Sequence, residues 1–449
     1  MVAKSNSRGR GEALRASLWF WPAVAAAGSF LLTLLVLTIR PEPGTAWASV
    51  VWPAGTQAAS TVLQVVATAV MTAMTTTFSL TVVALQLASQ QFSPRLLREF
   101  ARDPKTQVTL AVLISTFVVA STGLRGMGSE APLPVLVPAL ALLLGLASAA
   151  TLVMFLGHIV RTLRVDSMMV AVHQEATATV AETYPDYEDT TKDPDPDLPG
   201  PGGGTLLRSR RSGFVKVIDP GMLCQAAAKH QMFLLLGVRP GDHVTAGAPI
   251  GSVFTEQGLP AAGPEVLDRA VEQAVEMGFE RTLEQDAALG LRQLTDIAVK
   301  AISPGINDPI TAAHAVGYCS DLITRLQQKN LGPQQHLDAH GRVRVVTPDR
   351  DIRYYLDLVC APIRRFGAGE PLVLTALLRM LRACASTAQD ESQRHEIARQ
   401  VDLILRTMDA DLIDDDAQTV HDLAGRVHLA LAGNLDDAFR DRAGETRSV

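Results

Sequence analysis

The sequence predicts an α-helical integral membrane domain of four transmembrane helices, followed by a mixed α/β cytoplasmic domain with a helical C-terminal part. Of its 449 residues, 47% are hydrophobic and 19% are charged, with a mean hydropathy of +0.17, which is too apolar for an ordinary soluble enzyme. Residues 1–160 hold ten Lys/Arg and five Asp/Glu, against thirty and forty-one in the remainder. This split excludes a single soluble domain, a disordered or collagenous chain, and a basic nucleic-acid binder.

Four uncharged runs are long enough to cross a bilayer at a helical rise of about 1.5 Å per residue. They cover residues 18–39, 61–89, 106–124 and 133–156, within a membrane domain expected over residues 1–164. The first run is too long for the apolar part of a secretory signal and lacks a small-residue cleavage pattern, so we expect it to remain. The second run exceeds the bilayer thickness, and we expect it to tilt or to project into the cytoplasm.

Most basic residues that flank these runs are expected on one side of the membrane. These basic residues are Lys4, Arg8, Arg10, Arg15, Arg95, Arg98, Arg102, Lys105, Arg161 and Arg164. The other two loops carry only Arg40 and Arg125. By the positive-inside rule, both termini are expected in the cytoplasm of a bacterial cytoplasmic (inner) membrane protein with several spans.

The second span carries a polar stripe whose members recur at steps of three, four or seven, the period of one helix face. They are Thr61, Gln64, Thr68, Thr72, Thr75, Ser79, Gln86 and Ser89. One interpretation is close packing of helices through small hydroxyl residues. The other is a hydrophilic path lined by copies of this helix around an oligomer axis. The central parts of the spans contain no ionisable residue, which disfavours a carboxylate-driven pump and leaves a passive conduit or an anchor.

Residues 165–205 are expected to form a connecting helix followed by an acidic, Pro/Gly-rich linker. Residues 206–260 predict a small β-rich domain, because 213–218 and 232–238 alternate or run apolar and hairpin signals follow. This section resembles the hammerhead domains related to biotinyl and lipoyl carriers. It lacks the modified Lys of a Met-Lys-Met-like hairpin tip, so we expect a spacer or assembly domain rather than a carrier.

Residues 264–433 predict a cytoplasmic helical domain, with a polar tail over 434–449. One helix must end near residues 303–305, and Asp308 with Pro309 predicts the cap and first turn of the next. The polar residues around this turn form a candidate ligand or gating site, namely Arg281, Asp286, Asp296, Asn307 and Asp308. Oxygen atoms of Asp286, Asn307 and Asp308 suit a cation. The alternative is a turn held by helix caps and a salt bridge.

The remaining motifs predict neither a metal nor a cofactor. Four cysteines, at positions 224, 319, 360 and 384, are too widely spaced for a zinc knuckle or disulfide framework, which predicts reduced core thiols. His336 and His340 flank Asp338 without a further defined ligand, as in an exposed hairpin. No P-loop, nucleophile elbow, metalloprotease helix or dinucleotide fingerprint occurs. We therefore expect no enzyme activity.

Two long runs carry a family resemblance. Residues 77–97, at the exit of the second span, and residues 281–312, which contain Ile302-Ser-Pro-Gly-Ile-Asn-Asp-Pro309, are similar to bacterial membrane proteins catalogued as the domain of unknown function 2254 family. The resemblance implies a four-span membrane protein with a cytoplasmic domain. It implies no activity, substrate or catalytic residue.

The leading functional hypothesis is a homo-oligomeric channel or passive conduit for ions or small solutes, lined by the polar face of the second span and assembled or gated by the cytoplasmic domain. The alternative is a membrane-tethered regulatory or scaffold protein that binds a cytosolic partner. A hydrolase using Asp308 has no nucleophile and base arrangement to support it. The expected partners are the lipid bilayer, further copies of the chain, and an ion or small solute, and not nucleic acid.

Overall fold

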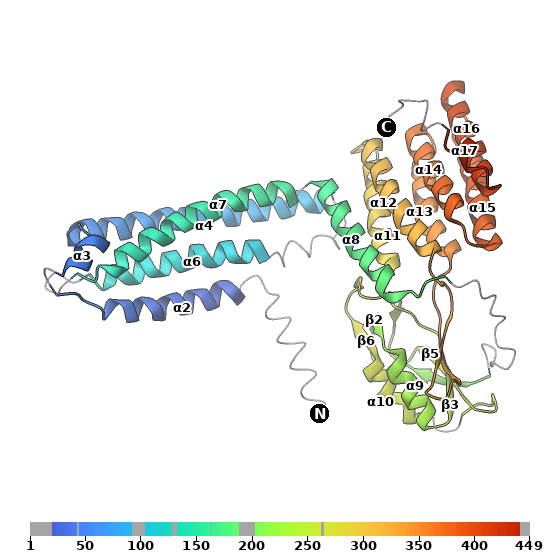
Figure 1. The fold of residues 1–449 in the computed structure, drawn as a ribbon, viewed down its shortest axis with the longest axis horizontal. Coiled ribbons are helices and arrows are strands. Elements are labelled where there is room, and N and C mark those ends of the chain that lie inside the picture. The colour runs from blue at the N-terminus through green and yellow to red at the C-terminus, as the bar shows by residue number, and fades with distance from the viewer. Residues whose placement is uncertain are drawn as a thin grey trace. The chain divides into compact units, whose positions relative to one another are not determined.

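The computed structural model describes residues 20–42, 45–91, 104–127, 133–162, 164–187, 203–261 and 265–440. The chain forms two compact units, Met1–Met168 and Met169–Val449, drawn in Figure 1. The basic flanks before residue 20 and at 95–102, most of the acidic linker, Ser89 as a side chain, and the tail after residue 440 lie outside what is described. Each unit is treated by itself below.

The first unit contains four long apolar helices, as predicted. They are α2 (Phe20–Leu37), α4 (Thr56–Gln91), α6 (Pro104–Arg125) and α7 (Leu136–Thr162). All four are long and apolar enough to cross a membrane. A short helix, α3 (Ala46–Val51), lies between the first two. The helices α4 and α7 run beyond the predicted bounds, because no proline or charged residue interrupts the pattern at residues 56–60 or 157–160.

Helix α6 is the centre of the first unit, because it contacts α2, α4 and α7. Its buried residues include the polar Thr106, Gln107, Thr109 and Thr116. The Thr116 hydroxyl lies 2.8 Å from that of Ser148 on α7. Large apolar side chains are exposed on the other helices, for example Leu31, Leu143 and Met154. The unit therefore packs through small and polar residues as well as large apolar ones such as Leu63 and Leu113, and it also exposes large apolar side chains, as membrane helices do.

Replacing Gly123 with Ala should lower the thermal stability of the detergent-solubilised protein. A Cβ at this position of α6 would overlap Val137 of α7, and such overpacking costs about 1–3 kcal/mol. Gly28→Ala on α2 is the matched control, because a Cβ there has no neighbour within 4 Å. Equal melting temperatures for the two variants would contradict the packing described here.

The described residues of the second unit form eight strands in two sheets. They are β1 (Thr205–Arg208), β2 (Gly213–Ile218), β3 (Met232–Leu236), β4 (His243–Val244), β5 (Pro249–Thr255), β6 (Val275–Gly278), β7 (Gln334–Leu337) and β8 (Val343–Thr347). One sheet has the order β1-β5-β3-β8-β7 and the other β4-β2-β6. All pairs are antiparallel except β3 with β8, in which Leu234 pairs with Val345.

The β-rich part is thus larger than the predicted residues 206–260. Strand β6 and the β7–β8 hairpin fall within residues 264–433, the predicted helical domain, where only a hairpin near residues 336–347 was expected, and they complete the two sheets. Alternation over residues 342–347 marks a strand, and Val345 is fully buried, but periodicity says nothing about which strand lies beside it. The small β-rich domain predicted from one local run thus takes further strands from residues 275–347.

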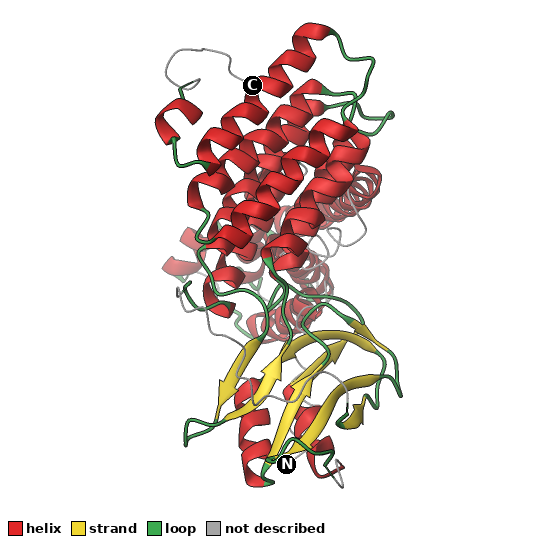
Figure 2. Cartoon of the chain, turned by 90° about the vertical axis from the view of Figure 1, so that its right-hand side faces the viewer, coloured by secondary structure: helices red, strands yellow, loops and turns green. Residues whose placement is uncertain are grey.

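The helices of the second unit are α8 (Val165–Thr183), α9 (Pro220–Lys229), α10 (Glu265–Ala274), α11 (Ala287–Ala301), α12 (Pro309–Gln327), α13 (Ile352–Phe366), α14 (Pro371–Thr387), α15 (Glu391–Thr407), α16 (Asp414–Leu431) and α17 (Leu435–Ala438). Helices α11 to α16 form three stacked antiparallel hairpins: α11, α13 and α15 make one layer, and α12, α14 and α16 the other. The strands gather at one end of this hairpin stack (Figure 2).

The four cysteines are free and buried in the second unit. Burial raises the pKa of each thiol, and for Cys360 to about 12. The thiolate is the reactive species. These cysteines are therefore protected from reagents in two ways, because their side chains are buried and because the thiols stay protonated.

N-ethylmaleimide should therefore leave the folded protein unmodified at pH 7 and alkylate all four cysteines after denaturation. Intact-mass spectrometry before and after unfolding measures this directly. Rapid modification of the folded chain at neutral pH would show that at least one thiol is accessible and ionised.

Candidate functional site: an exposed polar helix face and a buried charge cluster

The polar stripe of α4 faces away from its own unit. Its predicted members are all exposed: Thr61, Gln64, Thr68, Thr72, Thr75, Ser79 and Gln86. At 100° per residue these seven fall within an arc of about 80°. Leu63, Val70, Thr77 and Ala84, which are buried, lie on the opposite side. Among the residues that the structure describes, the stripe therefore does not pack against α6 or another helix.

Most hydroxyl groups of α4 are satisfied by the helix itself. Thr72 donates to the Thr68 carbonyl oxygen at 3.0 Å, Thr75 to that of Met71 at 3.0 Å, and Thr61 to that of Gln57 at 2.8 Å. Such bonds to the preceding turn are the usual solution for Ser and Thr in an apolar setting. The Gln64 amide has no hydrogen-bond partner among the described residues, although it lies about 12 Å inside the helix.

A second set of predicted residues meets in the second unit, where Asp286 is fully buried. Its Oδ2 lies 2.7 Å from Arg281 Nε and 2.6 Å from Arg281 Nη2. Its Oδ1 lies 3.4 Å from Nη1 of Arg350, which is itself buried. One carboxylate thus stands between two guanidinium groups, an arrangement we call the Asp286 cluster.

Three elements converge on the Asp286 cluster. Asp286 directly precedes α11, and Arg350 stands just before Asp351, the N-cap of α13. Arg350 Nη2 also donates to the Pro240 carbonyl oxygen at 2.9 Å. Gly241 has a φ of +91°, and a Cβ there would overlap the Asp286 carboxylate. Only glycine therefore lets the turn before β4 lie against the cluster.

Charge and burial act in opposite directions within the Asp286 cluster. Burial raises the pKa of the Asp286 carboxyl, while Arg350 and Arg281 oppose that rise. Burial lowers the pKa of the Arg350 guanidinium, but Asp286, Tyr355 and Tyr354 together more than offset this, and the net shift is upward. The Asp286 cluster thus links the starts of α11 and α13 in the hairpin stack to the turn before β4 through ion pairs and a hydrogen bond.

The other predicted members of this site lie elsewhere. Asn307 and Asp308 follow the C-terminal end of α11, and Asp286 precedes its start, so about 22 Å of helix separates them. Asp296 lies midway along the helix. The structure therefore does not bring Asp286 together with Asn307 and Asp308, because α11 lies between them and they stand at its opposite ends.

Asp308 is the N-cap of α12, as predicted. Its carboxylate accepts hydrogen bonds from the Thr311 backbone N–H at 3.1 Å and from the Thr311 hydroxyl at 2.6 Å. These bonds hold the pKa of Asp308 below its ordinary value. Asn307 adopts a left-handed φ of +52°, which asparagine tolerates better than most residues. Both side chains thus have structural roles in the turn.

Sequence reasoning missed Arg350. Its neighbours Asp349 and Asp351 mark a helix start, but nothing local indicates that the side chain reaches residue 286. Arg350 also lies over the Tyr354 ring, with 5.2 Å between the guanidinium carbon and the ring centroid. A charged residue directly before a predicted helix was the only available signal.

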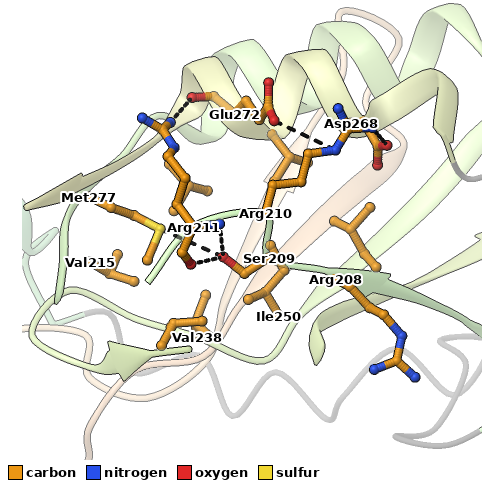
Figure 3. A pocket seen from close by; sticks show the side chains of 14 residues that line it. Arg208, Ser209, Arg210, Arg211, Val215, Val238, Ile250, Asp268, Glu272 and Met277 are labelled. Atoms are coloured by element: carbon orange, nitrogen blue, oxygen red, sulfur yellow. Dashed lines mark hydrogen bonds and ion pairs between the residues drawn. The ribbon is translucent and has the colours of Figure 1, made fainter. Parts of the chain in front are cut away.

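A pocket opens between the sheets and α10 (Figure 3). Its floor is apolar, and Arg208, Arg210 and Arg211 line its rim. Arg210 lies 2.5 Å from Asp268 and 3.6 Å from Glu272, and the other two arginines donate to backbone carbonyl oxygens. Because the basic groups are already engaged, the pocket supports no assignment of a ligand.

The described residues contain no group of three or more His, Cys, Asp or Glu side chains that is able to hold a metal ion. His336 Nε2 lies 2.9 Å from the Thr347 hydroxyl, and Arg344 Nε donates to Asp338 at 2.7 Å. The His336 side chain and the Asp338 carboxylate therefore have separate partners within a β hairpin, and the His340 backbone N–H donates to Asp338.

Replacing Asp286 with Ala should destabilise the second unit by about 3–5 kcal/mol, because two buried guanidinium groups lose their carboxylate. Asp308→Ala, which removes a helix cap, should cost only about 0.5–2 kcal/mol. Thermal unfolding of the full chain compares them. An Asp286→Ala protein as stable as the Asp308→Ala protein would contradict the central role of the cluster.

Comparisons with known proteins agree with this architecture. Residues 15–383 match the family described as predicted membrane protein (DUF2254). Uncharacterized proteins of Mycobacterium bovis and Mycobacterium tuberculosis are 33% identical over 406 residues, which cover 90% of this chain and 78% of theirs. No solved structure matches. With four long apolar helices and a family match over most of its length, the chain belongs to the family of predicted membrane proteins named domain of unknown function 2254.

Proposed function

We propose that the protein is a homo-oligomeric membrane channel or passive conduit for ions or small solutes, in which the exposed face of α4 from each copy lines the path. The observation that carries this proposal is the exposure of all seven stripe residues on the single chain. Polar residues that serve packing are found on α6, where they are buried. The stripe on α4 packs against none of the helices in the described part of the chain.

Energetics favour a polar environment for this face. In one isolated copy, the Gln64 amide would meet hydrocarbon without a partner, at a cost of about 1–3 kcal/mol on protein-based scales. Water in a path, or the same amide in a neighbouring copy, would remove that cost. A ring of identical helices supplies both.

The chemistry of the path follows from its lining. Helix α4 contains no Asp, Glu, Lys, Arg or His, so hydroxyl and amide dipoles would contact the permeating species. Neutral dipoles bind an ion weakly enough for it to leave. This favours passive flux rather than coupled transport.

The second unit would lie in the cytoplasm and serve assembly or gating. The basic flanks favour that orientation, with both termini on the same side of a bacterial cytoplasmic membrane. The Asp286 cluster supports the gating role, because it ties the sheets to the starts of α11 and α13 and would transmit movement between them.

Substituting Thr72 and Ser79 together with Leu should lower flux from proteoliposomes by about tenfold or more, since a barrier higher by ~1.4 kcal/mol has that effect. Separate K⁺, Na⁺, Cl⁻ and proton gradients identify the permeating ion. Thr76→Leu is the matched control: Thr76 is also exposed on α4 but lies outside the stripe, and this variant should keep its flux.

Two results would contradict the conduit. One is wild-type flux in the Thr72→Leu, Ser79→Leu protein. The other is the absence of flux under every gradient from a purified oligomer whose α4 helices lie at its periphery.

A membrane-tethered scaffold is the second candidate, favoured by the hairpin stack. Stacked helical hairpins in two layers are the architecture of α-solenoids, which present extended binding surfaces. This function requires a cytosolic partner that co-purifies with the full chain, together with no flux.

A further inference from the structure

Helix α3 is a short apolar helix that its own unit does not bury. It has six residues, and none of them is buried by the chain. Trp47 is 44% exposed, Val50 is 81% exposed and Val51 is 37% exposed. So short a helix is stabilised by packing rather than by propensity. For α3, this packing has to come from outside the described part of the chain.

The large apolar side chains of α3 lie on one face. At 100° per residue, Trp47, Val50 and Val51 fall within an arc of about 100°. Ser49 lies on the other side of the helix, where its hydroxyl donates to the Ala46 carbonyl oxygen at 2.9 Å. No charged residue occurs between positions 43 and 94, so no charge holds the apolar face in water. A tryptophan beside aliphatic residues is typical of a membrane–water interface.

Side-chain packing fixes the end of the first unit to which α3 belongs. One hydrophobic cluster includes Leu37, Leu63, Leu124 and Val137. Leu37 and Leu124 lie at the ends of α2 and α6, and the other two lie near the starts of α4 and α7. Helix α3, which connects α2 to α4, lies at this same end of the four helices (Figure 1).

The level of this end relative to a bilayer follows from the helix lengths. Helix α2 has 18 residues, or about 27 Å, so it only just crosses a hydrocarbon core of about 30 Å, and Leu37 marks the boundary of that core. A Cβ on Gly126 would overlap Leu37, and a Cβ on Gly123 would lie 3.5 Å from Leu63. Leu37 therefore lies about 4.5 Å further out than Leu63, because three residues of helix separate the two glycines.

Helix α4 carries α3 into the polar layer of the bilayer. Thr56, the first residue of α4, precedes Leu63 by seven residues, which places it about 6 Å beyond Leu37. The headgroup layer is about 5–8 Å thick on each side, so Thr56 lies within it. Val51 is at most about 18 Å of extended chain from Thr56. Helix α3 is thus able to reach any depth of this layer.

We propose that α3 lies in the headgroup layer of the bilayer, with Trp47, Val50 and Val51 inserted towards the acyl chains. Ser49 then faces water. Lipid is the occupant that fits, because the apolar face continues the exposed apolar surface at the end of α2, where Leu35 is 64% exposed. The inference rests on the crossing of a bilayer by the four helices, and it is independent of conduction.

Quenching of a fluorescent label from the lipid and from the water tests this position. Because the native cysteines are buried, Val50→Cys and Ser49→Cys can each be labelled selectively with a nitrobenzoxadiazole probe in the full chain. In phosphatidylcholine nanodiscs, lipid with a nitroxide near the headgroup should quench the probe at position 50 about twofold more than the probe at position 49. Aqueous Co²⁺ should quench the two probes in the opposite order.

Substitution tests the apolar face itself. Trp47→Asp should abolish the preferential quenching by lipid at position 50, because a carboxylate opposes insertion of this face. Glu42→Asp, a charge-conserving change outside α3, is the control and should leave that quenching unchanged. A probe at Val65→Cys, which is exposed on α4, should keep its quenching by lipid in every variant and thereby shows that the four helices remain inserted.

Two results would overturn the proposal. Equal quenching of the probes at positions 49 and 50 by Co²⁺ would place both faces of α3 in water. Protection of position 50 from both quenchers would place the face against protein, such as a second copy of the chain. Neither result involves flux, so failure of this proposal is distinct from failure of the conduit.

Discussion

The second unit depends on the ion pairs of Asp286 with Arg281 and Arg350. Fully buried charges are costly unless each is paired, and here one carboxylate serves two guanidinium groups contributed by separate segments. The same contacts fix the starts of α11 and α13 side by side, and Arg350 and Gly241 bring the turn before β4 against them. Both the parallel course of the hairpins and the attachment of the sheets follow from this pairing.

Polar residues on α6 and on α4 have different surroundings in the first unit. On α6 they are buried, and the hydroxyl groups of Thr116 and Ser148 bond across to α7, so they join helices. On α4 the hydroxyl groups bond to their own helix and face outward. The same residue types at similar spacing thus differ in meaning according to which neighbours surround them. That contrast, rather than the stripe alone, favours a path shared between copies.

Local patterns were enough to predict several features. Uncharged runs predicted α2, α4, α6 and α7, Asp308 before Pro309 predicted a helix cap, and the unpaired spacing of the cysteines predicted buried free thiols. Long-range partners were beyond reach. Strand β8 joins β3 across more than one hundred positions, and Arg350 approaches Asp286 across 64; neither spacing leaves a periodic signal.

By itself, the sequence determined that four helices are apolar enough for a bilayer, because hydropathy and helix length are properties of each segment alone. It also determined where α12 begins, since the Asp308 cap acts within one turn. Only the tertiary structure decided that the α4 stripe is exposed, that Asp286 and Asp308 stand at opposite ends of a helix, and that α3 has no buried side chain. Exposure and proximity belong to a packed arrangement of segments, and no single segment contains them.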